Sequence, residues 1–369
     1  MKEYIHQLPD WPRFHWNCER LAEPLAATSR QQGRLFGHME ALGFSLRQEA
    51  VLQTLTADVL KTSEIEGERL DAEQVRSSIA RRLGMDIAGL KPADRNVEGI
   101  VEMMLDATRD YQQPLTAERL FGWHASLFPS GRSGMTKIRV GAWRDDSAGP
   151  MQVVSGPVGL EKVHFEAPPA ARLDGDMAVF LDSFNKEGDI DPVLKSALAH
   201  LWFVTIHPFD DGNGRMARAI ADMQLARSEG SPQRFYSMSS QIREERKAYY
   251  DILEQTQYGT MDITPWMEWF LSCLGRAITR AHDELGSVLA KAKFWESIHA
   301  APLNERQRMM LNRLLDGFQG KLTTVKWAQL AKCSHDTALR DIQDLLMRGI
   351  LVQSPGGGRS TSYSLAGIS

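Results

Sequence analysis

The sequence is short of cysteine, of long hydrophobic runs and of any excess of one charge. Its three cysteines, Cys18, Cys273 and Cys333, lie far apart in a chain of 369 residues, so neither a disulfide framework nor a cysteine-based zinc site is expected. The N-terminus has no apolar signal core, and uncharged runs such as residues 196–209 are shorter than the ~20 apolar residues that span a bilayer. We therefore expect a soluble protein of the cytoplasm with no membrane partner.

The charges nearly balance over the whole chain but not along it. Forty-three Lys and Arg stand against forty-seven Asp and Glu, which gives a net charge of −4 and excludes a strongly basic nucleic-acid binder. From Leu303 onward the net charge is +4, which leaves −8 for the preceding part. This asymmetry indicates a separate C-terminal domain.

Hydrophobic spacing predicts a mainly α-helical protein. The clearest helices are expected at residues 48–63, 97–107, 177–184, 194–206 and 216–225. Residues 138–169 break the pattern because they are rich in Gly, Pro and Val, and a short hairpin is expected at residues 151–159. Residues 300–302 are expected to be a linker. We divide the chain into an N-terminal helical region (1–92), a helical core (93–300) and a C-terminal domain (303–369).

Residues 207–218, HPFDDGNGRMAR, connect two of the expected helices and have the composition of a phosphate-binding loop. Gly212, Asn213 and Gly214 tolerate positive φ, so successive backbone N–H groups can turn inward around an anion. The following helix adds its unpaired N-terminal amides. Arg215 and Arg218 are three residues apart, so they share a face of that helix and can both approach phosphate oxygens.

Two further residues of the loop suit phosphate chemistry. Asp211 places a hard carboxylate beside the glycines, as a magnesium–phosphate site requires. His207 has an unperturbed pKa near neutrality, so it can accept a proton from a hydroxyl group. The alternative is a polar turn between helices, with Gly and Asn as caps and both arginines in solvent. That alternative suits a Gly-Asn-Gly turn alone better than the full string of residues.

The complete string resembles the motif of the Fic family, HPFx(D/E)GNGRxxR, at every defined position. The resemblance implies an all-helical Fic core that transfers AMP from ATP to a protein hydroxyl. It also implies a role for each matching residue: His207 as the general base, Asp211 as the Mg²⁺ ligand, Gly212, Asn213, Gly214 and Arg215 as phosphate ligands, Arg218 as the ligand of the γ-phosphate, and Phe209 as the anchor of the loop.

Two neighbouring segments are similar to other parts of Fic proteins. Residues 141–144, GAWR, resemble the segment before the flap, and residues 152–156, QVVSG, resemble the flap itself. An exposed hairpin edge can pair with an extended segment of a target protein, and a plain surface loop is the alternative. The resemblance places Val153, Val154, Ser155 and Gly156 beside the nucleotide. Tyr249 and Tyr250 resemble an aromatic pair near the adenine, and simple packing in the core is the alternative for both.

An acidic segment upstream resembles an inhibitory motif. Residues 62–67, TSEIEG, fit the (S/T)xxxE(G/N) motif of Fic proteins whose inhibitory helix precedes the core. On a helix, Thr62 and Glu66 lie one turn apart on one face. We expect Glu66 to pair with Arg218 and to occupy the space of the γ-phosphate, so that ATP binds with its α-phosphate misaligned. The alternative is a solvated acidic helix end.

The sequence predicts no catalytic residue at either end of the chain. The first ~45 residues resemble the aromatic-rich extension of long bacterial Fic proteins, with packing or a homodimer surface as the expected role. The C-terminal domain resembles DeoR-like winged helices. Its helices are expected at residues 305–315, 325–332 and 335–348, and its hairpin strands at residues 350–353 and 363–365. Ser334 suits the N-cap of the third helix, and Gly349 suits its end.

The winged helix has two interpretations. Contact with DNA would use His335, Thr337 and Arg340 in the major groove, with Lys332 and Arg359 on phosphates. Acidic residues repel phosphate and weaken this interpretation; they are Asp336, Asp341 and Asp344. Docking to a protein, or dimerisation, is the favoured alternative.

The leading functional hypothesis is therefore a protein adenylyltransferase that modifies a Ser, Thr or Tyr of target proteins and of itself, using ATP and Mg²⁺. The same loop would also suit removal of AMP from a modified protein or transfer of another phosphate-linked group. A third hypothesis is a transcriptional regulator whose core only senses nucleotide. The intact His207 argues against this one, because a sensor needs no general base.

Overall fold

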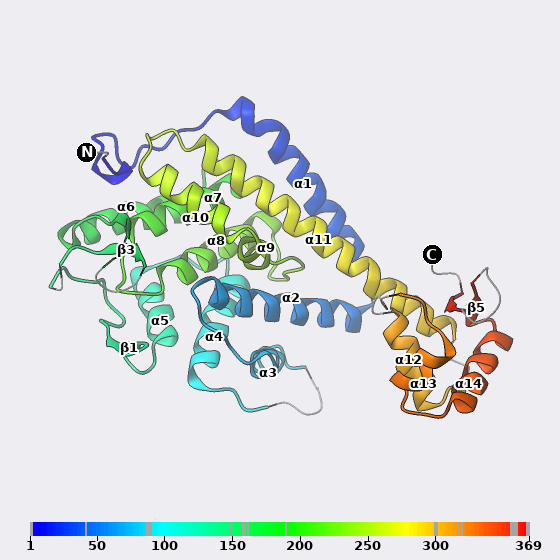
Figure 1. The fold of residues 1–369 in the computed structure, drawn as a ribbon. Coiled ribbons are helices and arrows are strands. Elements are labelled where there is room, and N and C mark those ends of the chain that lie inside the picture. Colours follow the sequence, from blue (N-terminus) through cyan, green and yellow to red (C-terminus); the bar gives the residue numbers. More distant parts are fainter. Residues whose placement is uncertain are drawn as a thin grey trace. The chain divides into compact units, whose positions relative to one another are not determined.

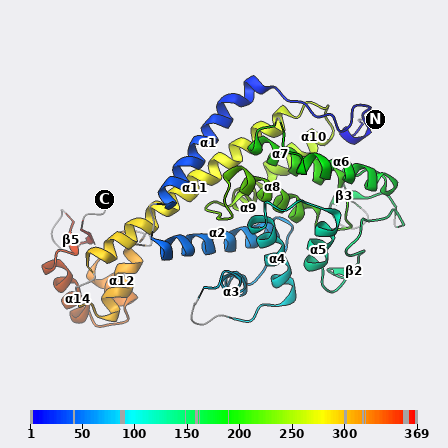
Figure 2. The same ribbon diagram turned by 180° about the vertical axis from the view of Figure 1, so that it is seen from behind.

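The computed structural model describes residues 3–366 apart from 41–42, 86–90, 148, 157–159, 161, 189, 299–301, 316–317, 319 and 355–360. The chain forms two compact units, Met1–Ala281 and His282–Ser369. Figure 1 shows the elements of each unit, and Figure 2 shows them from behind. The fold is mainly α-helical, as the sequence predicts, and the strands among the described residues form two-stranded antiparallel pairs.

The first unit contains the helices that position the candidate site. They are α1 (Cys18–Glu40), α2 (Phe44–Ile65), α3 (Ala72–Arg82), α4 (Arg95–Arg109), α5 (Ala117–Leu127), α6 (Leu173–Asn185), α7 (Pro192–Ile206), α8 (Asn213–Glu229), α9 (Met238–Glu244), α10 (Arg246–Gln257) and the start of α11 (Thr264–Ser297), with short 3₁₀ turns at Ile5–Gln7 and Ala170–Arg172. Its strands are β1 (Arg132–Ser133), β2 (Thr136–Lys137), β3 (Gln152–Ser155) and β4 (Lys162–Glu166). Each helix expected from hydrophobic spacing lies inside a longer observed helix.

Helices α7 and α8 pack together at the centre of this unit. Helix α7 begins at Pro192, where the missing N–H costs nothing, and the Asp191 side chain accepts from the next two amides. Every residue from Val193 to Ile206 except Lys195 is buried. A helix apolar on all sides must lie inside the protein. The loop that joins α7 to α8 is therefore fixed at both ends by the core.

The structure confirms the first strand of the expected hairpin and places the second strand later in the chain. Strand β3 forms at Gln152–Ser155 as predicted, but its partner β4 is Lys162–Glu166, beyond the expected end at residue 159. The pairing is antiparallel, and its register shifts between Val153 and Val154. Phe165 is buried, so burial of this aromatic ring favours the later segment as the paired strand.

The N-terminal region packs on the core rather than forming a separate unit. Helix α1 lies beside α11 in both views (Figures 1 and 2), where Arg20 forms an ion pair with Glu268 at 2.7 Å. Phe14 contacts Trp202, with 5.5 Å between ring centroids. The structure thus divides the chain differently from the sequence: no unit boundary falls near residue 92, and the boundary at residue 281 lies within α11. The expected linker falls largely outside the described residues.

The second unit contains the end of α11, α12 (Glu305–Leu315), α13 (Thr324–Leu330), α14 (His335–Met347), and the paired strands β5 (Leu351–Gln353) and β6 (Tyr363–Leu365). Ser334 caps α14 by accepting from Thr337 N, as predicted. Asp341 is buried and pairs with Arg306 at 2.9 Å, and Asp344 pairs with Arg348. Because these two acids are neutralised within the unit, they would repel DNA less than the sequence alone suggests. Arg359 lies outside the described residues.

Among the described residues, no helix is long and apolar enough to cross a membrane.

Candidate active site

The loop between α7 and α8 is closed by its own side chains. Phe209 is fully buried, and the side chain of Asn213 accepts from Phe209 N at 3.0 Å while donating to Phe209 O at 2.8 Å. Gly212 takes the left-handed conformation, with φ +83°, which favours glycine. The Asn213 side chain is thus used to shape the loop, and only its backbone N–H could face an anion.

A buried histidine that the sequence analysis did not single out supports this loop. The His124 ring of α5 stacks on the Phe209 ring, with 4.2 Å between centroids. Gly141 N donates to His124 Nδ1, so the ring proton is on Nε2, which donates to Asp211 O. Burial lowers the pKa of His124 to about 4. A single histidine among apolar residues carries no sequence signal that distinguishes this role from ordinary packing.

The orientation of His207 suits a general base. It caps the C-terminus of α7 in the left-handed conformation, and its Nδ1 donates to Val204 O at 3.1 Å. Burial lowers its pKa to about 4, and the nearby Arg144 contributes. The ring is therefore neutral at pH 7, and Nε2 carries the lone pair that can accept a proton. The buried Arg144 guanidinium of the 141–144 segment fixes the same residue by donating to His207 O at 2.8 Å.

Asp211 presents a partly exposed carboxylate at the loop. One oxygen accepts from Gly212 N and the other from the hydroxyl of Ser133 on β1. The described residues contain no cluster of three metal-ligating side chains. A Mg²⁺ ion in a nucleotide site is usually held by one or two carboxylates together with substrate phosphates. The hard oxygen donors of Asp211 fit that kind of site.

Arg218 is held by the acidic segment, as the sequence predicts for the inhibitory motif. Its Nε donates to Thr62 Oγ1 at 2.7 Å, and its Nη2 donates to Thr62 O at 3.0 Å and to Glu66 Oε1 at 2.7 Å. Only 2% of Arg218 is exposed. A Cβ at Gly214 would lie 2.3 Å from Glu66 Oε1. Glu66 therefore occupies the space directly above the first turn of α8, where a phosphate group would approach.

A second carboxyl layer lies deeper between the same helices. Asp58 is four residues before Thr62 on α2, and Asp222 is four residues after Arg218 on α8; both are buried. Ser237 donates to Asp58, and Arg234 pairs with Asp222 at 2.9 Å. Burial, with a contribution from the negative charge of Asp58, raises the pKa of Asp222 to about 8. These contacts tie α2 to the start of α9, and α8 to the segment that precedes α9.

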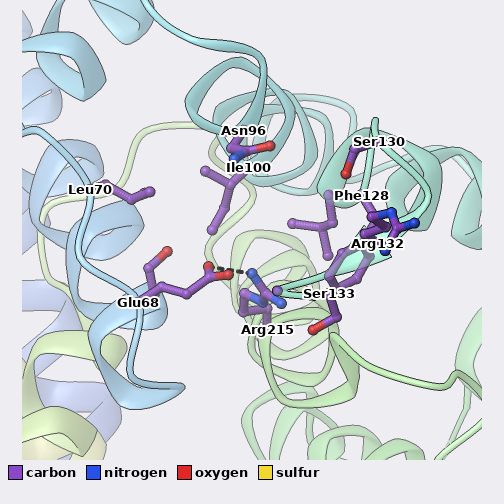
Figure 3. A pocket seen from close by; sticks show the side chains of 12 residues that line it. Glu68, Leu70, Asn96, Ile100, Phe128, Ser130, Arg132, Ser133 and Arg215 are labelled. Atoms are coloured by element: carbon purple, nitrogen blue, oxygen red, sulfur yellow. Dashed lines mark hydrogen bonds and ion pairs between the residues drawn. The ribbon is translucent and has the colours of Figure 1, made fainter. Parts of the chain in front are cut away.

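Arg215 also has an acidic partner, which the sequence analysis missed. Its Nη1 donates to Glu68 Oε2 at 2.6 Å, and its guanidinium lies over the Phe128 ring at 5.0 Å (Figure 3). A cavity of about 250 Å³ borders this pair. Its lining residues include Leu70, Asn96, Ile100, Ser130, Arg132 and Ser133. Glu68 lies outside the inhibitory motif, so the motif alone gave no reason to select it.

The residues of the predicted flap and the two tyrosines differ in how far their side chains are exposed. Val154 is 47% exposed on the outer face of β3, while Ser155 donates to or accepts from His164 of β4 at 2.6 Å. Gly156 ends the strand. Tyr249 is 1% exposed, and its hydroxyl bonds with His200 Nε2 at 2.9 Å. This burial supports the packing alternative for Tyr249 over contact with a nucleotide.

Tyr250 differs from its neighbour in sequence. It is 36% exposed and lies under the guanidinium of Arg246 at 5.2 Å. Arg246 in turn donates to Ile65 O, at the end of α2. Tyr250 therefore has surface next to the acidic segment, and nucleotide contact remains a prediction for this residue.

The loop, the neutral histidine and the acidic segment define a site in which a glycine-rich loop between two helices is covered by carboxylates of the same chain. Comparison with known families agrees: residues 114–225 match the Fic/DOC family and residues 4–85 match a domain of unknown function (DUF4172). The part of the chain that contains the loop is thus similar to the Fic/DOC family.

Relatives and solved structures are similar to this chain at modest identity. The protein adenylyltransferase Fic of Nematostella vectensis is 36% identical over 116 residues, which cover 30% of this chain and 25% of that one. The protein of the same name from Drosophila grimshawi is 25% identical over 229 residues, covering 58% and 40%. The chain thus spans well under half the length of these relatives. A Fic family protein from Desulfovibrio desulfuricans has the same fold, with a TM-score of 0.53 and 21% identity over 95% of this chain and 96% of that one.

The buried His124 predicts a measurable pH dependence of stability. Its pKa is about 4 in the folded state and about 6.5 when unfolded, so the unfolded chain binds the proton first. Stability from this residue is therefore lost as pH falls from 6.5 to 4. We expect the difference in unfolding free energy between wild type and His124→Gln to shift by about 3 kcal/mol over that range in favour of the variant. Chemical denaturation at a series of pH values measures it.

The exposed His335 of the second unit provides the control. His335→Gln makes the same change of side chain at an exposed position, and its unfolding is measured at the same pH values. Equal slopes for wild type and His124→Gln would contradict the neutral, buried state of His124.

Proposed function

We propose that the chain is a protein adenylyltransferase that transfers AMP from Mg-ATP to a hydroxyl group of target proteins and of itself. The observation that carries the proposal is the tautomer of His207. Its Nδ1–H donates to Val204 O, so its basic Nε2 is available at the same loop that provides amides and arginines for phosphate. The names of the relatives agree with AMP transfer as the type of reaction.

The chemistry follows from these residues. A target hydroxyl attacks the α-phosphorus of ATP, and His207 Nε2 accepts the hydroxyl proton. A bond forms between the hydroxyl oxygen and the α-phosphorus, the bond to the bridging oxygen breaks, and pyrophosphate leaves. The amides at the start of α8, with Arg215 and Arg218, would bind the phosphates. Asp211 would hold Mg²⁺, which neutralises phosphate charge when bound.

The flap supplies a surface for the target protein. The partly exposed edge of β3, with Val154 outward, could pair with an extended target segment as an additional strand.

For the second unit, three helices followed by the β5–β6 pair support the winged-helix interpretation. Asp341 and Asp344 are paired with arginines, so both DNA contact and protein docking stay as candidate roles of this unit.

The position of the ATP phosphate that is transferred to protein tests the proposal. Incubation of the full chain with α-labelled ATP should label protein, whereas γ-labelled ATP should not. His207→Ala should reduce α-label transfer by ~10²–10⁴-fold, the usual contribution of a general base, while ATP binding measured by calorimetry persists. Label from the γ position would indicate a kinase instead. Normal transfer by His207→Ala would remove this residue from the mechanism.

The contact between Glu66 and Arg218 predicts an intrinsic brake. Like charges repel by several kcal/mol at close range in a partly buried cleft, so the Glu66 carboxylate and a γ-phosphate cannot share Arg218. We expect Glu66→Gly to raise automodification several-fold or more. The increase should be mainly in kcat, because the substitution restores alignment of the α-phosphate.

The double variant Glu66→Gly with Arg218→Ala separates two explanations of such an increase. If activation depends on the freed arginine, the double variant loses it. Equal activation without Arg218 would mean that the brake does not act through this pair, and an unchanged rate in Glu66→Gly alone would make the segment an ordinary helix end.

A further inference from the structure

Both arginines of the phosphate-binding loop are occupied by carboxylates of one short segment. Arg218 pairs with Glu66 and Arg215 pairs with Glu68, in each case with a nitrogen–oxygen distance of 2.6–2.7 Å. Because the two ion pairs use different arginines, removing one acid leaves the other arginine blocked. Glu66 alone therefore does not account for the closed state of the loop.

The Glu68–Arg215 pair is asymmetric. The Arg215 side chain is 4% exposed, lies over Phe128, and has a buried Nε without a hydrogen-bond partner. Glu68 has a side chain that is 50% exposed and lies after the end of α2, outside any helix. A buried guanidinium without a counter-charge is costly, while Glu68 can turn into solvent without breaking a helix. The arginine is thus the fixed partner and Glu68 the exchangeable one.

Space is available beside the pair for another anion. The cavity of about 250 Å³ is lined by Arg215 and Glu68 and by the polar side chains of Ser130 and Ser133 (Figure 3). Asp211, the other acid near Arg215, is farther away, at 3.9 Å from Nη2. Glu68 is therefore the carboxylate that an incoming phosphate group has to replace at this guanidinium.

We propose that Glu68 is a second inhibitory residue, which stands in for a phosphate group at Arg215 and so weakens nucleotide binding. The inference rests on the proposed function and divides the inhibition into two parts. Glu66 controls the alignment of the phosphate chain through Arg218. Glu68 controls affinity, because the phosphate chain must displace it from Arg215 before that contact forms.

The test measures binding of ADP by calorimetry to the full chain, without turnover. Glu68→Gln keeps the size of the side chain and removes its charge, so ADP should bind roughly two- to fivefold more tightly, the range expected from a half-exposed ion pair. Adenosine has no phosphate and should bind equally to both proteins. In automodification, Glu68→Gln should lower KM for ATP, whereas Glu66→Gly should raise kcat.

Glu64→Gln is the matched control. It makes the same charge change four residues earlier in the chain, at a carboxylate that pairs with Lys61 and Arg243 instead of Arg215 or Arg218. ADP affinity equal to wild type in Glu68→Gln, or an equal gain in Glu64→Gln or for adenosine, would overturn the role of Glu68. Absence of ADP binding in every variant, with unchanged thermal unfolding, would overturn the proposed function itself and this inference with it.

Discussion

The buried guanidinium of Arg218 is the constraint on which the arrangement of this site depends. A cation that is 2% exposed must be paired where it lies, because an uncompensated buried charge is strongly destabilising. Thr62 and Glu66 provide that pairing, and so the end of α2 is tied to the first turns of α8. The close approach also explains Gly214, where any side chain would meet the Glu66 carboxylate. The contact that we propose to be inhibitory therefore also stabilises the packing of two helices.

Burial, with a smaller contribution from nearby arginines, accounts for the charge state of the buried histidines around the loop. Burial is the first cause that lowers the pKa of His124, His200 and His207, and Arg215, Arg218 and Arg144 respectively lower it further. All three rings are neutral at pH 7, and their hydrogen bonds assign the proton to one nitrogen in His124 and His207. Neutral imidazoles accept protons, so burial keeps His207 in the form that a general base requires.

The sequence predicted the helices around the loop from hydrophobic residues one helical turn apart on one face. The pairing of Glu66 with Arg218, 152 residues apart, was predicted only because residues 62–67 resemble the inhibitory motif. Glu68 and His124 were missed, because their partners lie 147 and 85 residues away in the chain and no spacing rule connects them. Tyr249 was offered as a nucleotide contact, but its burial depends on tertiary packing that the sequence pattern does not specify.

The self-contained hydrogen bonding of the loop has a consequence for binding affinity. Because Asn213 and Phe209 close the loop without a ligand, binding need not order it, and its intrinsic affinity is set during folding. The apparent association constant then equals the intrinsic association constant multiplied by the fraction of molecules in which the acidic segment is open. A partner protein that contacts only α2 or the connection after it could therefore tune nucleotide occupancy over a wide range while never touching the loop.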